Sequence, residues 1–181
     1  MDLVNKSKYN IILGSGSSRR KELLGMTGIN FSVMSIPVDE SFPDSLQGTE
    51  ISEYIVKNKS NAFNKLIKEN EIIITADTLV WFENKCLGKP KDKKEAKYML
   101  KLFAGKSHDV ITSVGILTLS NFKVLTEITT VIYKSLTDSE IDAGMILTCQ
   151  GYPTSNELTV DVDDIWVLLI CIAIFQAYKS F

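Results

Sequence analysis

The chain has 181 residues, and its 20 lysines and arginines almost balance its 22 aspartates and glutamates, for a net charge of −2. This length favours one domain, or two small lobes, with a core large enough to need no disulfide or metal. The composition, 45% hydrophobic and 23% charged, is that of an ordinary globular protein and excludes a disordered chain. The near-neutral charge excludes a protein that binds nucleic acid through bulk positive charge, but a few cations could still hold a small phosphate ligand.

Three cysteines and a single histidine limit the chemistry that is available. The cysteines, Cys86, Cys149 and Cys171, are far apart and lack metal-ligand spacing, which favours free thiols, buried as small apolar side chains, in a reducing compartment. His108 stands alone, so a site built on several histidines is excluded. Residues 1–10 are polar and lack the apolar core of a signal peptide, so we expect a cytoplasmic protein.

Strands and helices alternate along the first half of the chain. Tyr9–Leu13 predicts a short strand that ends at a glycine, and Arg19–Met26 predicts a short amphipathic helix. We expect a second strand at Asn30–Ile36 and, after a polar loop at Ser41–Gly48, a helix at Ile51–Lys68.

The middle of the chain predicts two strands and a capped helix. Ile72–Ala76 is β-branched and typical of a central strand, and Leu79–Phe82 predicts a further strand that turns at Glu83–Lys85. Asp92 and Glu95 have the spacing of a capping box, which predicts the start of a helix.

After this helix the sequence predicts a hairpin and a second capping box. The helix runs to Phe103, with Gly105 as its terminating glycine. Asp109–Leu119 and Lys123–Tyr133 predict a hairpin, and residues 137–140 form a second capping box.

The segment Leu13–Arg20 has the composition of a phosphate-binding loop between a strand and a helix. Its glycines let the backbone approach an anion, and its serine hydroxyls can donate hydrogen bonds. Arg19 and Arg20 are the only arginines in the chain, and arginine suits forked recognition of phosphate. The segment matches neither a Walker A loop nor GxGxxG, and a plain strand–turn–helix junction stays open as the alternative.

Two further residues carry candidate chemistry. Asp77 follows directly after an apolar strand, where open α/β sheets place ligands, and it could bind a divalent metal or act as a general base. The alternative is that Asp77 caps a turn. Lys89 precedes Pro90, which favours a held ammonium group over the alternative of a solvated surface lysine.

Together, LGSGSSRRKELL, ADTLV and LGKP, followed by EAKYMLKLFAGKSHDVITSVGI, resemble the Maf family of nucleoside triphosphate pyrophosphatases, once named septum-formation inhibitors. The resemblance covers about Ile11 to Ile141, and the order and spacing of the motifs carry it. It implies hydrolysis of a nucleoside triphosphate to a monophosphate and pyrophosphate with a divalent cation, Mg²⁺ or Mn²⁺. It also implies a two-lobed α/β fold of the Maf/ITPase kind around a long mixed sheet, with the site in a central cleft.

The resemblance assigns roles to individual residues. Asp77 matches the proposed proton acceptor, Glu40 an acidic position after the second strand, and Lys89 the lysine of the Gly-Lys-Pro motif. Asp77 and Glu40 would hold the cation, and an ionised aspartate beside a metal is a weak base but a good ligand. The positions that match substrate and phosphate binding are Ser15, Ser17, Arg19, Arg20, Lys59 and Thr78.

Two of these matches carry more detail. Lys59 matches a helical lysine by its distance upstream of Asp77, although Ser60 stands where the family has alanine. Arg19 and Thr78 resemble the branch of the family that hydrolyses dTTP and UTP.

The family pattern ends after Ile141, so we expect a Maf-like core at residues 1–141 and a divergent segment at residues 142–181. The apolar run Ile165–Ala177 has about 13 residues, fewer than the roughly 20 of a membrane span, and favours a buried strand or helix over the alternative of a membrane-associated end. We expect this segment to be the least well-packed part of the chain. The result would be weak activity, low solubility, or a homodimer formed through Trp166–Tyr178.

Three functions therefore stay open. The first is an active nucleoside triphosphate pyrophosphatase, and the second is a catalytically impaired relative that still binds nucleotide. The third is a regulatory protein linked to cell division, which only the old family name supports. We expect a nucleoside triphosphate as the partner, with no nucleic acid and no membrane span.

Overall fold

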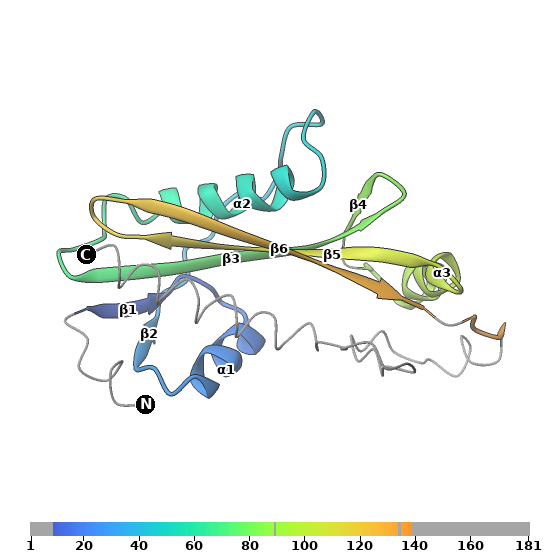
Figure 1. Cartoon of the computed structure of the whole chain (residues 1–181), viewed down its shortest axis with the longest axis horizontal. Helices are drawn as coiled ribbons and strands as arrows, with labels where there is room; N and C mark the ends of the chain where they lie inside the picture. The colour runs from blue at the N-terminus through green and yellow to red at the C-terminus, as the bar shows by residue number, and fades with distance from the viewer. Residues whose placement is uncertain (1–8, 89, 134, 139–181) are drawn as a thin grey trace.

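The computed structural model describes residues 9–88, 90–133 and 135–138 (Figure 1). These residues form a mixed α/β fold, as the sequence predicts, with six strands in one sheet and three helices. The divergent segment 142–181 and most of the second capping box lie outside the described residues. In chain order the elements are β1 (Asn10–Leu13), α1 (Ser18–Met26), β2 (Phe31–Val33), α2 (Thr49–Asn61), β3 (Glu71–Phe82), β4 (Lys85–Leu87), α3 (Lys93–Phe103), β5 (Ser107–Leu117) and β6 (Phe122–Ile132).

The sheet changes character along its longest strand, β3. The strand order is β2-β1-β3-β5-β6; β1 is parallel to β2 and β3, whereas β5 is antiparallel to β3 and β6. On the edge of β3 away from β5, β1 pairs as far as Ile74, and β4 pairs from Val80 onward. No described strand pairs with this edge between Ile74 and Val80.

Helices α1 and α2 cover opposite faces of the sheet (Figure 1). Because side chains alternate along a strand, neighbouring residues of β3 contribute to different cores. Ile74 and Ala76 belong to the core that includes Leu23 and Leu24 of α1, whereas Leu79 packs with residues of α2. Consecutive residues of β3 therefore meet different helices.

Helix α2 approaches the sheet closely because small residues and hydroxyl pairs line the contact. Ser52 and Ser113 share a 2.7 Å hydrogen bond, and Ser60 and Thr75 share another of the same length. All four side chains are fully buried, so their hydroxyl groups must find partners within the protein. Gly115, directly opposite Thr75 on β5, leaves the space that this approach needs.

A separate core holds α3 against the far end of the sheet. Phe82 and Phe103 meet edge to face, with ring centroids 5.3 Å apart, and His108 stacks on Phe103 at 4.4 Å. His108 is buried, its Nδ1 has no partner among the described residues, and burial lowers its pKa against the opposing charge of Asp109. The histidine is thus a core residue, remote in the chain from the predicted phosphate loop.

The structure corrects several predicted boundaries. The predicted strands Ile72–Ala76 and Leu79–Phe82 are one continuous strand, because β5 pairs with β3 throughout this stretch. The second strand covers only Phe31–Val33, and the helix predicted at Ile51–Lys68 ends at Asn61. Beyond α2 the chain forms turns that place Phe63 in the core beside Ile73.

The capped helix is confirmed, with one difference in its first turn. Asp92 accepts a hydrogen bond from the backbone N–H of Glu95, but the Glu95 carboxylate accepts from the N–H of Lys91 and not from that of Asp92. Gly105 follows the helix with a φ of 70°, as a terminating glycine should. Within the described part of the chain, no helix has both the length and the apolar character needed to cross a membrane.

Close packing at Gly115 gives a stability prediction. A Cβ there would lie 2.5 Å from Val56 and 2.8 Å from the hydroxyl of Thr75, so Gly115→Ala should force α2 away from the sheet. We expect it to lower the free energy of unfolding by about 1–3 kcal/mol, measured by urea denaturation. Gly25→Ala is the matched control: nothing lies within 4 Å of the added carbon, and alanine should stabilise α1 by up to about 1 kcal/mol. Equal effects of the two substitutions would contradict the packing argument.

Candidate active site

The candidate site begins where β1 leaves the sheet. The backbone N–H of Gly14 donates to the carbonyl of Ile74 at 2.7 Å, and this is the last bond that continues the β1 pairing. A side chain at Gly14 would lie 3.0 Å from both Phe63 and Thr75, so glycine allows the chain to turn away at this point. The next carbonyl that faces the vacated edge belongs to Ala76.

Two cations satisfy the Ala76 carbonyl in place of a strand. Arg20 Nη1 donates to it at 2.8 Å, and Lys59 Nζ donates at 3.4 Å. Arg20 comes from α1 on one face of the sheet, and Lys59 comes from the last turn of α2 on the other. Both side chains therefore meet at the gap in the strand pairing.

Two carboxylates complete the cluster through Lys59. Its ammonium group lies 2.7 Å from Asp77 Oδ1 and 2.8 Å from Glu40 Oε1. The Lys59 and Asp77 side chains are only 14% and 12% exposed, whereas that of Glu40 is 60% exposed. The inner pair is therefore shielded from water and the outer carboxylate is open to it. Arg20, Lys59, Asp77 and Glu40 are called the charge cluster below.

The surroundings of Glu40 and Arg20 support the charge cluster. Asp39 accepts hydrogen bonds from the backbone N–H and the hydroxyl of Ser41, at 2.9 and 2.7 Å, and these bonds lower the pKa of Asp39. The resulting turn presents Glu40. Burial lowers the pKa of Arg20, whereas the negative charges of Asp77 and Glu40 oppose that shift, and an arginine stays protonated under these conditions.

The predicted phosphate loop divides into residues that join the cluster and residues that do not. Ser15 is buried, and its hydroxyl accepts from Arg20 Nη1 at 3.4 Å. Ser17 caps α1 by accepting from the backbone N–H of Arg20, also at 3.4 Å. Arg19 points away and pairs with Glu22 at 3.1 Å on an exposed surface. The two arginines, which the sequence does not distinguish, thus have different surroundings.

Asp77, Thr78 and Lys89 are three other predicted site residues. Asp77 does not end its strand, because β5 still pairs with β3 and the strand continues to Phe82. The strand end that lies at the site is therefore that of β1. Thr78, the next residue, is on the opposite face of β3, where its hydroxyl pairs with Thr112 at 3.2 Å. Lys89 lies outside the described residues.

Cys86, predicted to be a buried apolar residue, is only partly buried on β4. Burial and the charge of Asp77 raise its pKa, so the thiol is held in its protonated form. Cys149 and Cys171 lie outside the described residues.

Two features of the site, the Ala76 carbonyl and the Asp39–Ser41 turn, are not among the predicted residues. A backbone carbonyl leaves no side-chain signal, and its availability depends on where a distant strand ends. The Asp39–Ser41 pair has a recognisable signal, because aspartate two residues before serine is typical of a local turn.

The carboxylate oxygens of the charge cluster suit a divalent cation that also binds the substrate. One oxygen of Asp77 and one of Glu40 contact the same Lys59 nitrogen, so these two oxygens face one small volume. Among the described residues, no group of three or more histidines, cysteines, aspartates or glutamates is arranged to hold a metal. Mg²⁺ is commonly bound by one or two carboxylates, with substrate phosphates and water as the other ligands, and these residues fit that pattern.

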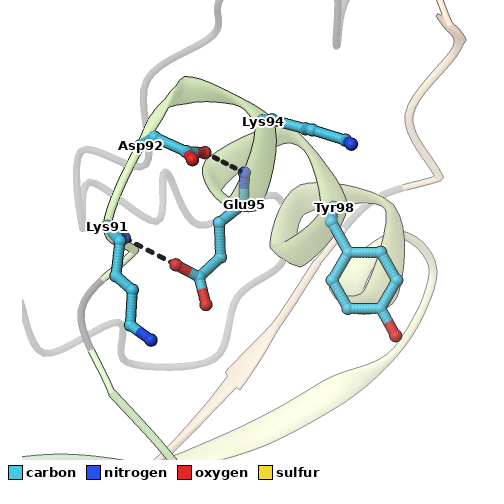
Figure 2. A pocket seen from close by; sticks show the side chains of 5 residues that line it. All are labelled: Lys91, Asp92, Lys94, Glu95 and Tyr98. Atoms are coloured by element: carbon cyan, nitrogen blue, oxygen red, sulfur yellow. Dashed lines mark hydrogen bonds between the residues drawn. The ribbon is translucent and has the colours of Figure 1, made fainter.

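A concave surface lies at the start of α3, apart from the charge cluster (Figure 2). Its lining residues are Lys91, Asp92, Lys94, Glu95 and Tyr98. A helix N-terminus attracts anions, but here the carboxylates of Asp92 and Glu95 already accept from the backbone N–H groups. The first turn of α1, in contrast, carries no acidic residue. The start of α1 is therefore the better place for a phosphate.

The different roles of the two arginines give a second prediction. Arg20→Ala should remove a charge-assisted hydrogen bond from the Ala76 carbonyl and lower the free energy of unfolding by about 1–3 kcal/mol. Arg19→Ala removes an exposed ion pair and should cost no more than about 0.5 kcal/mol. Urea denaturation of both variants measures the difference. A loss for Arg19→Ala as large as that for Arg20→Ala would refute the assignment.

Comparison with known proteins identifies the family of the chain. A family model described as Maf-like protein matches residues 10–148. A protein of Bacteroides fragilis (strain YCH46) named dTTP/UTP pyrophosphatase is 44% identical over 140 residues, which cover 77% of this chain and 72% of the relative. A protein of the same name from Flavobacterium johnsoniae is 42% identical over 134 residues, 74% of this chain and 69% of the relative.

One solved structure adds support for the fold alone. A HAM1 protein from Coxiella burnetii superposes with a TM-score of 0.50 at 8% sequence identity, over 93% of this chain and 99% of its own. The match of the family model to most of the chain, with relatives above 40% identity, settles the classification. The chain belongs to the Maf-like protein family.

Proposed function

We propose that this protein hydrolyses pyrimidine nucleoside triphosphates, with dTTP and UTP preferred, to the monophosphate and pyrophosphate. The observation that carries the proposal is the charge cluster: two cations and two carboxylates gathered at the end of β1, beside a loop of small residues and serines. Relatives that are 44% and 42% identical carry the name dTTP/UTP pyrophosphatase, which supports the substrate class. The substrate class in turn implies a cytoplasmic location.

The reaction is the attack of water on the α-phosphorus, with pyrophosphate as the leaving group. A new bond forms between the water oxygen and phosphorus, the bond from phosphorus to the bridging oxygen breaks, and water loses a proton. Phosphoryl transfer of this kind needs positioning and charge neutralisation more than covalent help from the protein. Arg20, with its planar fork, is proposed to bind phosphate oxygens beside the Ser15–Ser17 loop.

The carboxylates are proposed to act on water and the cation. Asp77 and Glu40 would hold a divalent cation, which when bound supplies positive charge to the phosphates and lowers the pKa of water. Asp77, the more buried of the two, orients the attacking water and accepts its proton. Lys59, and Lys89 outside the described residues, are proposed to balance the charge of the departing pyrophosphate.

Asp77→Asn tests the proposed role of the carboxylate. The amide keeps the shape of the side chain and an oxygen that Lys59 can approach, so the loss of stability should stay near 1 kcal/mol. The charge that binds the cation and accepts a proton is lost, and we expect kcat for dTTP to fall by about 100- to 10,000-fold. Pyrophosphate release measures the rate, and urea denaturation measures the stability.

Asp109→Asn is the matched control for this test. Asp109 is on β5 and accepts a 2.7 Å hydrogen bond from Thr130, which an amide oxygen can also accept. Its kcat should stay within about twofold of wild type. Near-normal turnover of Asp77→Asn would remove Asp77 from the mechanism.

Substrate preference gives a separate prediction. We expect kcat/KM for dTTP and UTP to exceed that for GTP by about 100-fold, because a site that hydrogen-bonds one base leaves its polar groups unpaired with another. Arg19 and Thr78 remain the predicted sources of this preference. A chimera that joins residues 1–141 to the C-terminal segment of a dTTP/UTP pyrophosphatase relative should be assayed in parallel. Comparable efficiency on all three triphosphates in both proteins would refute the pyrimidine preference.

A further inference from the structure

The Lys59 ammonium group has no hydrogen-bonding capacity left for a ligand. A lysine ammonium has three N–H donors. Those of Lys59 face three acceptors: Asp77 Oδ1 at 2.7 Å, Glu40 Oε1 at 2.8 Å and the Ala76 carbonyl at 3.4 Å. A substrate phosphate can gain a bond from Lys59 only if one of these three acceptors is released.

The carboxylates that hold Lys59 are also the ones proposed to hold the divalent cation. An ammonium group and a divalent cation cannot share the space between the same two oxygens, because both are positive and the Lys59–Asp77 pair is shielded from water. Occupation by one must weaken the other. The competition is a direct consequence of the two short ion pairs.

The protein can release Lys59 without losing the rest of the site. The Ala76 carbonyl keeps its 2.8 Å bond from Arg20 when Lys59 moves. The backbone of α2 stays in place because Ser60, the next residue, is fixed to Thr75 by a buried hydrogen bond. Only the flexible four-carbon side chain has to rotate.

We propose that Lys59 is a built-in counter-ion that occupies the cation site until cation and substrate arrive together. The cation takes over the two carboxylates, and the released ammonium binds the phosphates of the substrate. The cation alone then binds weakly, because it must displace Lys59 into water, whereas cation and triphosphate bind cooperatively. This inference rests on the proposed function for the identity of the substrate, but the competition itself does not need turnover.

Binding of Mn²⁺ to the nucleotide-free protein tests the competition. Lys59→Met removes the competing charge and keeps an unbranched side chain, so Mn²⁺ should bind roughly 5- to 100-fold more tightly than to wild type. Electron paramagnetic resonance of free Mn²⁺ gives the dissociation constant. Adding Asp77→Asn to Lys59→Met should abolish the gain, which places the ion at this site.

Two control variants keep the result interpretable. Lys57→Met removes a lysine from the exposed face of the same helix and should leave Mn²⁺ affinity unchanged. Lys59→Gln, which is neutral but polar, should reproduce the gain if the methionine variant folds poorly. Unchanged or weaker Mn²⁺ binding by both Lys59 variants would overturn the proposal, as would an equal gain for Lys57→Met.

The coupling between the two ligands is tested with a non-hydrolysable α,β-imido analogue of dTTP. After correction for the complex of Mn²⁺ with the analogue in solution, the analogue should tighten Mn²⁺ binding more in wild type than in Lys59→Met. An equal effect in both proteins would overturn the exchange of Lys59 between carboxylates and phosphates. Tighter Mn²⁺ binding by Lys59→Met in a protein that hydrolyses no triphosphate would uphold the competition and refute only the proposed function.

Discussion

One backbone carbonyl without a strand partner organises the candidate site. Where β1 turns away at Gly14, the Ala76 carbonyl loses the strand that would otherwise have paired with it. A buried carbonyl without a partner is costly, and here Arg20 and Lys59 reach it from opposite faces of the sheet. Once two cations are gathered at one atom, carboxylates must follow to balance them, and Asp77 and Glu40 do so.

The packing of α2 determines whether Lys59 can take part. The helix lies close to the sheet because Gly115 leaves room for Val56 and because buried hydroxyl pairs join α2 to the strands beneath it. Ser60 and Lys59 are adjacent, so the residue that anchors the helix to Thr75 also sets the starting point of the lysine side chain. Core packing and site geometry thus depend on the same short stretch of α2 and β3.

Much of the fold could be predicted from the sequence, because hydrophobic periodicity and local capping chemistry act over a few residues. The Asp92 cap and the hairpin predicted from Asp109–Leu119 and Lys123–Tyr133, observed as β5 and β6, are examples of such local signals. The predicted break between Ile72–Ala76 and Leu79–Phe82 was wrong, because the polar residues Asp77 and Thr78 resemble the end of an apolar strand. Their partners, Lys59 and Thr112, come from distant parts of the chain, and no local pattern reveals them.

The candidate site shows the same division between local and distant information. The motif positions of Asp77, Glu40, Lys59 and Arg20 could be predicted, and the structure brings these four side chains together. The contrast between Arg19 and Arg20 could not, since it depends on which face of a short helix meets the sheet. The role of the Ala76 carbonyl depends on the end of β1 and has no signal of its own.

The charge cluster is balanced before any ligand binds, and this has a consequence for how ligands enter. Two cations face two carboxylates, so the cluster has no excess positive charge with which to attract a triphosphate. A polyanionic substrate must therefore bring positive charge with it or take a cation away from its carboxylate. Under the proposed function, a metal–nucleotide complex would do both at once: its metal would bind Asp77 and Glu40, and its phosphates would bind Lys59. The substrate that best suits this arrangement is thus the complex, since neither component alone replaces every interaction that it breaks.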